Sequence, residues 1–335
     1  MNPKKLNVGV AGCGHLGKIH CKILKEISSM DEGIIFTGIF DIDKKNAAEA
    51  SKQFKVNSFN SFEELLKNID TLIVVTPTST HFHLAKEASG KNVNIFIEKP
   101  VTESLEEAKE LIKLTANSSI KIQVGHVERF NPALISLEEY NLNPRFIEAH
   151  RLSQFNPRGT DVSVIQDLMI HDIDIILNIV DSPIEKTDAN GVAIISDSID
   201  IANARLTFAN GCVANITSSR ISMKKMRKMR IFQPNAYISI DFLNNESEIF
   251  RLVNSSDTFD SALSYPISNN KKLIIEKPEK INLANQSNPI KNELLFFFNS
   301  IINNGPVKVT LEDAKRAVEV SDTIIKIISK QLTRV

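Results

Sequence analysis

The sequence predicts an α/β fold, with a doubly wound parallel sheet followed by an α+β domain whose sheet is mostly antiparallel. Within residues 1–124, short apolar runs alternate with helical segments, which indicates parallel strands covered by helices on both faces. From residue 125 onward, alternating polar and apolar strands flank turn dipeptides, which favours antiparallel pairing. Because 335 residues accommodate about two domains, we expect one over 1–124 and a second over 125–335.

The first domain is expected to contain five buried strands separated by helices. The strand-like runs are 6–11, 34–41, 70–75, 93–97 and 120–124. Helical segments follow the first four runs, at 18–27, 44–54, 81–90 and 104–116. Ser104 and Glu107 have capping-box spacing at the start of the last of these helices.

The second domain is expected to contain two hairpins and two C-terminal helices. Asn210-Gly211 lies between alternating strands in 201–217, and this dipeptide is a strong hairpin signal. The segment 236–252 repeats the pattern around a turn at Asn244-Asn245. Helices are predicted at about 290–302 and 310–331.

Composition excludes several classes of protein. The chain has 40 basic and 40 acidic residues, and this balance argues against nucleic-acid binding, which needs excess positive charge. Its three cysteines, Cys13, Cys21 and Cys212, include no pair with metal-ligand spacing, so we expect no metal site and a reduced, cytoplasmic chain. No apolar run approaches the ~20 residues of a membrane span, and no signal-peptide core follows the N-terminus, so we expect no membrane partner.

A glycine-rich turn, Gly12-x-Gly14-x-x-Gly17, joins the first strand to the first helix. Glycines at this spacing permit a tight turn and a close approach of the backbone to a pyrophosphate, and the helix N-terminus supplies free N–H groups. The strand, the helix and a downstream acid all lie where a dinucleotide-binding Rossmann motif requires them. The alternative interpretation is a purely structural turn.

Asp41 at the end of the second strand predicts the choice of dinucleotide. A carboxylate at this point accepts hydrogen bonds from the ribose hydroxyls of NAD and repels the 2′-phosphate of NADP. We therefore expect NAD, with NADP less favoured. Asp43 is the competing assignment, and Asp41 could instead cap the helix at 44–54.

An ordered set of motifs resembles the Gfo/Idh/MocA oxidoreductases. The motifs are GCGHLG at 12–17, TPTSTH at 76–81, EKP at 98–100, GHVERFNP at 125–132 and DLMIHDID at 167–174. The resemblance implies a Rossmann domain, a second domain with a large open sheet often used for oligomerisation, and hydride transfer between a nicotinamide and a sugar or cyclitol hydroxyl. It therefore implies a homodimer or homotetramer.

Within that family, two runs look most like bacterial enzymes that oxidise UDP-N-acetylglucosamine at C3 for amino-sugar variants of lipid A. These runs are GHVERFNPA and DLMIHDIDIIL. The expected substrate is therefore a UDP-N-acetylhexosamine. Two alternatives remain open, a dehydrogenase of a free sugar, inositol or other small polyol, and a catalytically silent nicotinamide-sensing regulatory protein.

The resemblance assigns catalysis to Lys99, Asp167 and His171. An unperturbed imidazole titrates at about pH 6.5, so His171 suits the base that accepts the hydroxyl proton. If the segment is helical, the four-residue spacing puts Asp167 on the same face, where it could orient the imidazole or bind a substrate hydroxyl. Lys99 would stabilise alkoxide character. The alternatives are a polar helical turn for the pair and a solvated charge for Lys99.

Cofactor contacts are expected from residues around the glycine turn and the following strand ends. Beyond the three glycines and Asp41, the assigned residues are His15, Leu16, Thr76, Pro77, His81, Glu98 and Lys99. In an open α/β sheet, ligands bind at the carboxyl ends of the strands, where Thr76 and Pro77 lie. His81 and His83 could equally be surface residues at a helix start.

Three arginines are candidates for substrate binding, beside Lys99, Asp167 and His171. They are Arg129 at the domain junction, and Arg151 and Arg158, whose guanidinium groups could clamp a diphosphate in bidentate fashion. For Arg151 and Arg158 the alternative is an ordinary surface ion pair. We interpret Asn131, followed by Pro132, as a helix N-cap. The basic cluster at 224–230 is expected to be one charged face of a strand or loop.

Overall fold

The computed structural model describes residues 5–156, 162–234, 236–258, 263–276 and 288–332. Contacts divide the chain into two units, Met1–Val127 with Asn288–Val318, and Glu128–Ser287 with Glu319–Val335. The expected second domain included the whole C-terminal part, but the segment Asn288–Val318 belongs to the first unit. The reason is helix α8 (Pro289–Ile302), whose Leu294, Phe297 and Phe298 are buried in the core of that unit.

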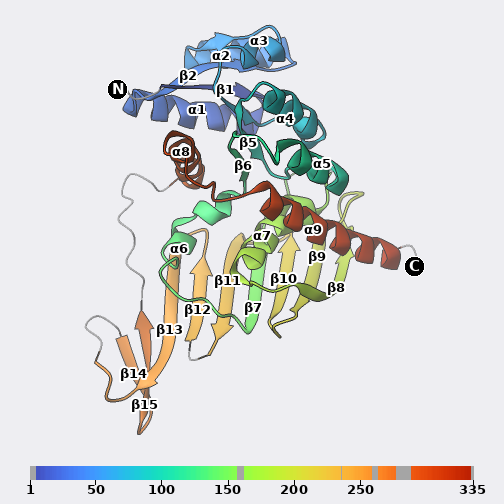
Figure 1. The fold of residues 1–335 in the computed structure, drawn as a ribbon. Coiled ribbons are helices and arrows are strands. Elements are labelled where there is room, and N and C mark those ends of the chain that lie inside the picture. Colours follow the sequence, from blue (N-terminus) through green and yellow to red (C-terminus); the bar gives the residue numbers. More distant parts are fainter. Residues whose placement is uncertain (1–4, 157–161, 235, 259–262, 277–287, 333–335) are drawn as a thin grey trace. The chain divides into compact units, whose positions relative to one another are not determined.

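The described part of the first unit contains the expected doubly wound parallel sheet (Figure 1). The strand order is β3-β2-β1-β4-β5-β6, and every pair of neighbours is parallel. The strands are β1 (Leu6–Ala11), β2 (Ile34–Phe40), β3 (Asn57–Ser58), β4 (Thr71–Val74), β5 (Asn94–Glu98) and β6 (Ile122–Gly125). All residues of β4 and β6 are buried, as expected for strands covered on both faces.

Helices alternate with these strands. They are α1 (His15–Met30), α2 (Lys44–Phe54), α3 (Phe62–Leu66), η1 (Thr78–Thr80), α4 (His81–Gly90) and α5 (Leu105–Thr115). Ser104 and Glu107 form the predicted capping box at the start of α5. The sequence did not indicate β3 or α3, because elements of two and five residues leave almost no periodic signal.

The second unit has the predicted large and mostly antiparallel sheet. The described strands follow the order β14-β15-β13-β12-β11-β7-β10-β9-β8, in which β7 and β10 are parallel and the other described pairs are antiparallel. The strands are β7 (Phe146–Leu152), β8 (Ile184–Val192), β9 (Ile201–Phe208), β10 (Val213–Ser219), β11 (Met226–Gln233), β12 (Ala236–Asp241), β13 (Glu246–Asn254), β14 (Leu263–Ser268) and β15 (Lys271–Glu276).

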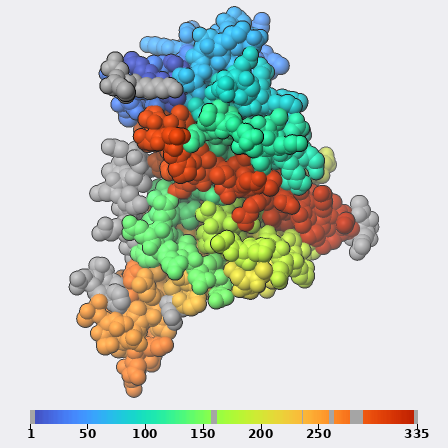
Figure 2. All heavy atoms as spheres, viewed as in Figure 1, coloured from blue at the N-terminus to red at the C-terminus, as the bar shows by residue number. Residues whose placement is uncertain are grey.

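Both predicted hairpins are present. Gly211 joins β9 to β10 with a φ of 82°, and Asn245 joins β12 to β13 with a φ of 54°. Both values lie in the left-handed region, which glycine and asparagine tolerate best. Strand β14 is exposed along its length, at the end of the second unit that is orange in Figure 2.

Helices pack against one face of this sheet. Helix α6 (Pro132–Ile135) contacts β12 and β13, and α7 (Ile170–Ile179) contacts β10. The C-terminal part of α9 (Leu311–Leu332) reaches β8, where Gln331 donates a hydrogen bond to the carbonyl of Ala189. A π-helical segment, η3 (Ile165–Met169), precedes α7, and η2 (Val127–Phe130) precedes α6. No helix in the described ranges is long and apolar enough to cross a membrane.

Candidate active site

The glycine loop has a steric requirement for glycine at two of its three glycine positions. Gly12 has a φ of +97°, and a Cβ there would lie 2.4 Å from the carbonyl oxygen of Val75. A Cβ on Gly17 would lie 2.0 Å from the carbonyl oxygen of Gly12. A Cβ on Gly14 would meet no atom within 4 Å. The loop is therefore closely packed at Gly12 and Gly17 and has open space at Gly14.

The N-terminus of α1 leaves its backbone donors available for an anion. Gly14 is the N-cap residue and supplies no side-chain cap, and the first turn holds no acidic residue. His15 and Leu16 are exposed beside it. Free N–H groups and the helix dipole favour a phosphate at such a position. The loop and helix therefore fit the pyrophosphate of a dinucleotide.

Asp41 points back to the glycine loop. Its Oδ2 accepts a hydrogen bond from the backbone N–H of Cys13 at 2.6 Å, and its Oδ1 accepts one from the N–H of Asp43 at 2.8 Å. Asp43 is the N-cap of α2 and accepts from the N–H of Lys45 at 2.9 Å. The alternative in which Asp41 caps this helix is therefore wrong, because Asp43 has that role.

The turn after β4 is held by a buried histidine. One ring nitrogen of His81, Nε2, lies 2.9 Å from the carbonyl oxygen of Thr76, and Nδ1 lies 2.9 Å from that of Pro100. The ring is almost fully buried, and burial lowers the pKa of His81 although both carbonyls favour its charged form. His81 is therefore not a surface residue, whereas His83 is exposed.

Both ring nitrogens of His81 contact backbone carbonyls. His81 would therefore contribute to cofactor binding only indirectly, by holding the turn after β4. Thr76 is half-buried, and its hydroxyl oxygen accepts a hydrogen bond from the hydroxyl of Thr80 at 2.7 Å. Pro77 is exposed. Thr76 and Pro77 keep their accessible position at the end of β4, which a cofactor contact requires.

Glu98 ends β5 inside the unit, in contact with a histidine. Its Oε1 lies 2.7 Å from Nε2 of His20 on α1, and its Oε2 accepts a hydrogen bond from the N–H of Lys99 at 3.2 Å. Burial alone would raise the pKa of Glu98, but the hydrogen bond and charge of His20 and the charge of Lys99 lower it below the ordinary value. Lys99 is half-buried, and the Lys99–Pro100 peptide is cis.

Asp167 and His171 lie at the junction of η3 and α7. Asp167 is within the π-helical segment and His171 is the second residue of α7, and both are half-buried. The segment is thus helical, as the spacing argument required, and π-helical turns are frequent at functional sites. These two residues belong to the second unit, whereas Lys99 and the glycine loop belong to the first.

Two of the three arginines that the sequence assigned to the substrate have buried carboxylate partners. Arg129 donates to Asp174 through Nε and Nη2, both at 2.7 Å, and to Asn178 through Nη1 at 2.8 Å. Arg151 donates to Asp172 through Nε and Nη2, both at 2.9 Å. A guanidinium without water needs counter-charges, and these contacts supply them.

Arg151 is the more deeply buried of the two. Its Nη1 also donates to Oε1 of Glu128 at 2.7 Å, and its side chain is 2% exposed. Burial opposes its charge, yet Asp172 and Glu128 raise the pKa of Arg151, while burial raises the pKa of Asp172. The alternative of an ordinary surface ion pair is therefore wrong for Arg151, whose Nε, Nη1 and Nη2 all donate to buried carboxylates. Arg158 lies outside the described residues.

The basic cluster at 224–230 is only partly the charged strand face that was predicted, because Lys228 and Arg230 share one face of β11 whereas Arg227 lies on the opposite face, 3.4 Å from Glu128. Lys228 pairs with Asp241 at 3.1 Å and Arg230 pairs with Glu148 at 3.4 Å, across neighbouring strands. Asn131 caps α6 by accepting from the N–H of Ala133, also as predicted. No group of His, Cys, Asp and Glu in the described ranges could hold a metal ion.

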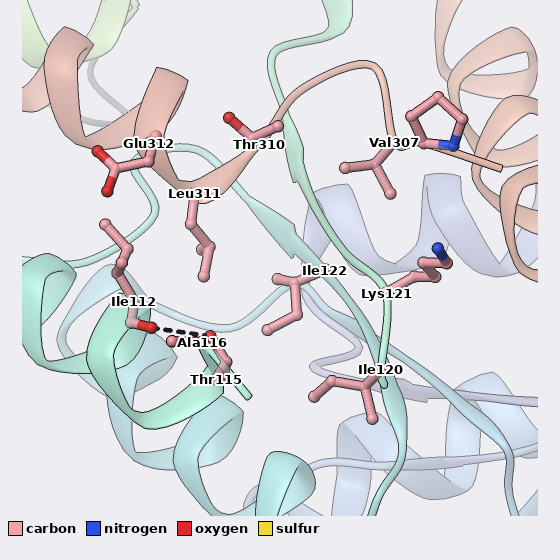
Figure 3. A pocket seen from close by; sticks show the side chains of 11 residues that line it. Ile112, Thr115, Ala116, Ile120, Lys121, Ile122, Val307, Thr310, Leu311 and Glu312 are labelled. Carbon is pink, nitrogen blue, oxygen red and sulfur yellow. Dashed lines mark hydrogen bonds between the residues drawn. The ribbon is translucent and has the colours of Figure 1, made fainter. Parts of the chain in front are cut away.

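A pocket of about 400 Å³ in the first unit shares no residue with the predicted site (Figure 3). It lies between the end of α5, the start of β6 and the segment before α9, and its lining is mainly apolar. The side chains drawn include Ile112, Ile120, Ile122 and Leu311. The predicted chemistry is therefore not located here.

Two family descriptions match most of the chain. Residues 6–126 match an oxidoreductase family with an NAD-binding Rossmann fold, and residues 140–238 match the Gfo/Idh/MocA C-terminal domain. The chain belongs to the Gfo/Idh/MocA oxidoreductase family. The Rossmann unit binds NAD, and the chain is an NAD-dependent dehydrogenase that acts on CH–OH groups. The silent regulatory alternative is therefore set aside.

Relatives within the Gfo/Idh/MocA family include a UDP-N-acetylglucosamine 3-dehydrogenase from Acidithiobacillus ferrooxidans. It is 39% identical over 246 residues, which are 73% of this chain and 77% of that protein. Its solved structure superposes with a TM-score of 0.84 at 31% identity, covering 97% of this chain and 98% of that one. A myo-inositol 2-dehydrogenase from Thermotoga maritima is 26% identical over 233 residues, 64% of this chain and 69% of that protein.

His20, the buried partner of Glu98 in this dehydrogenase, was not predicted from the sequence. His20 lies three residues after Gly17 in α1, and Ile23, Leu24 and Ile27 share its buried face. A histidine on an otherwise apolar helix face was the available signal. Its partner could not be read from the sequence, because Glu98 is 78 residues away.

Proposed function

We propose that this dehydrogenase oxidises the C3 hydroxyl of a UDP-N-acetylhexosamine, UDP-N-acetylglucosamine being the expected substrate. The observation that carries the proposal is the 39% identity to a UDP-N-acetylglucosamine 3-dehydrogenase, against 26% to a myo-inositol 2-dehydrogenase. The two sequence runs GHVERFNPA and DLMIHDIDIIL support the same substrate. The resemblance associates such an oxidation with amino-sugar variants of lipid A.

The first unit would hold the cofactor. Gly12, Gly14 and Gly17 would let the α1 N-terminus bind the pyrophosphate, and Asp41 would accept hydrogen bonds from the adenosine ribose. His15, Leu16, Thr76 and Pro77 would line the same cofactor site from the loop ends. When bound, NAD accepts the hydride.

Three side chains would act on the reacting hydroxyl. His171 takes its proton as the hydride leaves, and Asp167 orients the imidazole from one helical turn earlier. Lys99 stabilises negative charge developing on the substrate oxygen. Lys99 is also the leading candidate for the base if His171 proves structural.

The buried arginines would serve the site indirectly. Arg151 binds Asp172 and Arg129 binds Asp174, and both acids lie on α7 within three residues of His171. These pairs would fix the helix that carries the base. Arg158 is retained from the sequence as a contact to the substrate diphosphate.

We propose that the second unit forms homo-oligomers, a dimer or a tetramer, through the open face of its sheet. Four aromatic side chains cross this face as a continuous row, named here the aromatic stripe: Phe146, Phe232, Tyr237 and Phe250. Neighbouring rings lie 5.9, 5.0 and 5.0 Å apart between centroids. Apolar area of this kind on a sheet face favours burial against a partner.

A substrate panel tests the proposed function. Purified protein with NAD is offered UDP-N-acetylglucosamine, free N-acetylglucosamine and myo-inositol, and the absorbance of reduced nicotinamide is followed. We expect the highest kcat/KM with the nucleotide sugar. A higher value with myo-inositol would instead support the polyol dehydrogenase.

A further inference from the structure

A buried contact in the first unit joins α1, which follows the proposed cofactor loop, to the end of β5, which precedes the proposed catalytic residue Lys99. His20 lies on α1, the helix whose N-terminus follows the glycine loop. Glu98 lies at the end of β5, directly before Lys99. The imidazole and carboxylate meet at 2.7 Å, with side chains 0% and 10% exposed. The contact therefore links α1 directly to the residue preceding the lysine.

The chemistry of this contact fixes which atom donates. A carboxylate only accepts hydrogen bonds, so His20 presents an N–H at Nε2 to Glu98. Its other nitrogen, Nδ1, has no hydrogen-bond partner in the described part of the chain. The ring packs beside Phe96, with centroids 5.7 Å apart. The only polar interaction that His20 makes there is thus the one with Glu98.

The main chain around Lys99 is held on both sides by side chains, that of Glu98 at the end of β5 and that of His81 on α4. Before it, the second oxygen of Glu98 accepts the N–H of Lys99 at 3.2 Å, while the first binds His20. After it, the carbonyl of Pro100 contacts His81 on α4 at 2.9 Å. A backbone held at two consecutive points restricts where the Lys99 ammonium can reach, and such restriction matters at a reacting centre.

We propose that His20 is a positioning residue for Lys99, acting through the Glu98 carboxylate. The proposal rests on the proposed function, in which Lys99 stabilises charge on the substrate oxygen. His20 orients Glu98, Glu98 holds the backbone N–H of Lys99, and Lys99 is thereby aligned with α1 and the bound dinucleotide. His20 itself touches neither substrate nor cofactor.

Two substitutions of His20 distinguish a role in positioning Lys99 from a role in filling the core. His20→Gln keeps a donor near the place of Nε2, whereas His20→Leu removes it. We expect His20→Leu to lower kcat by about 10- to 100-fold, as misplacement of a catalytic group does. His20→Gln should recover most of that loss. NADH affinity, measured by fluorescence titration, should change less than about twofold in both, since the glycine loop is intact.

The Lys99→Ala background supplies the decisive comparison. If His20 acts through Lys99, adding His20→Leu to Lys99→Ala causes no further loss of kcat. An equal fractional loss in both backgrounds would overturn the proposal, because His20 would then act independently of Lys99. Loss of NADH affinity with unchanged kcat would also overturn it. If His20→Leu does not fold, Glu98→Gln replaces it in the same cycle.

The same set of variants distinguishes failure of this inference from failure of the proposed function. Full activity of Lys99→Ala alone would refute the catalytic role of Lys99. Reduced activity of Lys99→Ala together with full activity of His20→Leu would refute only the positioning role of His20.

Discussion

At the scale of single residues, local motifs and distant partners differed in how far the sequence could predict them. The glycine loop could be predicted because its motif occupies six consecutive residues between a strand and a helix. The close packing at Gly17 is local, against the carbonyl of Gly12, whereas Gly12 packs against the carbonyl of the distant Val75. Asp41 could be placed because it directly follows β2, the strand that pairs with β1. The ion pairs of Arg129 and Arg151 could not be predicted, since their carboxylate partners on α7 are 45 and 21 residues away in the sequence.

Cofactor choice should depend on Asp41. We expect NAD to bind at least about tenfold more tightly than NADP, a difference of about 1.4 kcal/mol, because the carboxylate favours ribose hydroxyls and repels a phosphate. Asp41→Ala should narrow the difference in titrations with both cofactors. Equal affinity of the unmodified protein for NAD and NADP would refute the assignment. An unchanged preference in Asp41→Ala would transfer the role to another group.

Turnover should depend on His171. His171→Ala is expected to lower kcat by about 10²- to 10⁴-fold, the usual loss for a general base, with NAD affinity retained. The rate of alcohol oxidation should rise with pH through one ionisation, because the base must be unprotonated, and the variant should lack that step. Steady-state rates across pH measure both. A variant with more than half the activity and the same pH profile would make His171 structural.

At the scale of elements, the hairpins and capped helices were predictable and the charged packing of α7 was not. Asn210-Gly211 and Asn244-Asn245 determine their turns locally, through backbone conformations that few residues adopt. The acids Asp172 and Asp174 resemble a polar helix face in the sequence, yet both are buried against arginines. The periodicity of a segment indicates which of its positions are polar, but it carries no information about an opposite charge on another helix or strand.

Removal of the Arg151 guanidinium should destabilise the second unit. Arg151→Met leaves the buried carboxylate of Asp172 without its bidentate partner and removes the shorter of two arginine contacts from Glu128, so we expect the free energy of unfolding to fall by about 3–5 kcal/mol. Urea unfolding monitored by circular dichroism measures the change. Lys186→Met removes an exposed ion pair with Asp188 and is the control, with an expected cost below about 1 kcal/mol. Similar costs for both variants would contradict a buried-charge role.

At the scale of the whole molecule, the fold classes of both domains could be predicted from the sequence. The return of the segment Asn288–Val318 to the first unit could not. Alternating apolar runs and helices indicated the parallel sheet, and hairpin dipeptides indicated the antiparallel one. The helix at 289–302 is amphipathic in either domain, so its sequence does not specify which core receives Phe297 and Phe298. That assignment depends on packing against α1, which only the folded unit shows.

Oligomer formation should depend on the aromatic stripe. We expect the unmodified protein to sediment as a dimer or tetramer, and Phe232→Glu combined with Tyr237→Glu to shift it toward the monomer, because charges on this face oppose burial. Met223→Glu is the control, since Met223 is 89% exposed and lies off the stripe. Analytical ultracentrifugation at micromolar concentration measures the state. A monomeric unmodified protein would reject the interface.

The most direct test of the account is the fate of the hydrogen at C3 of UDP-N-acetylglucosamine. The protein is incubated with NAD and substrate deuterated only at C3, and the reduced cofactor is analysed by mass spectrometry. The account predicts one deuterium in the reduced nicotinamide and a slower hydride-transfer step than with unlabelled substrate. Reduced cofactor without deuterium, or no reduction while myo-inositol is oxidised, would contradict it.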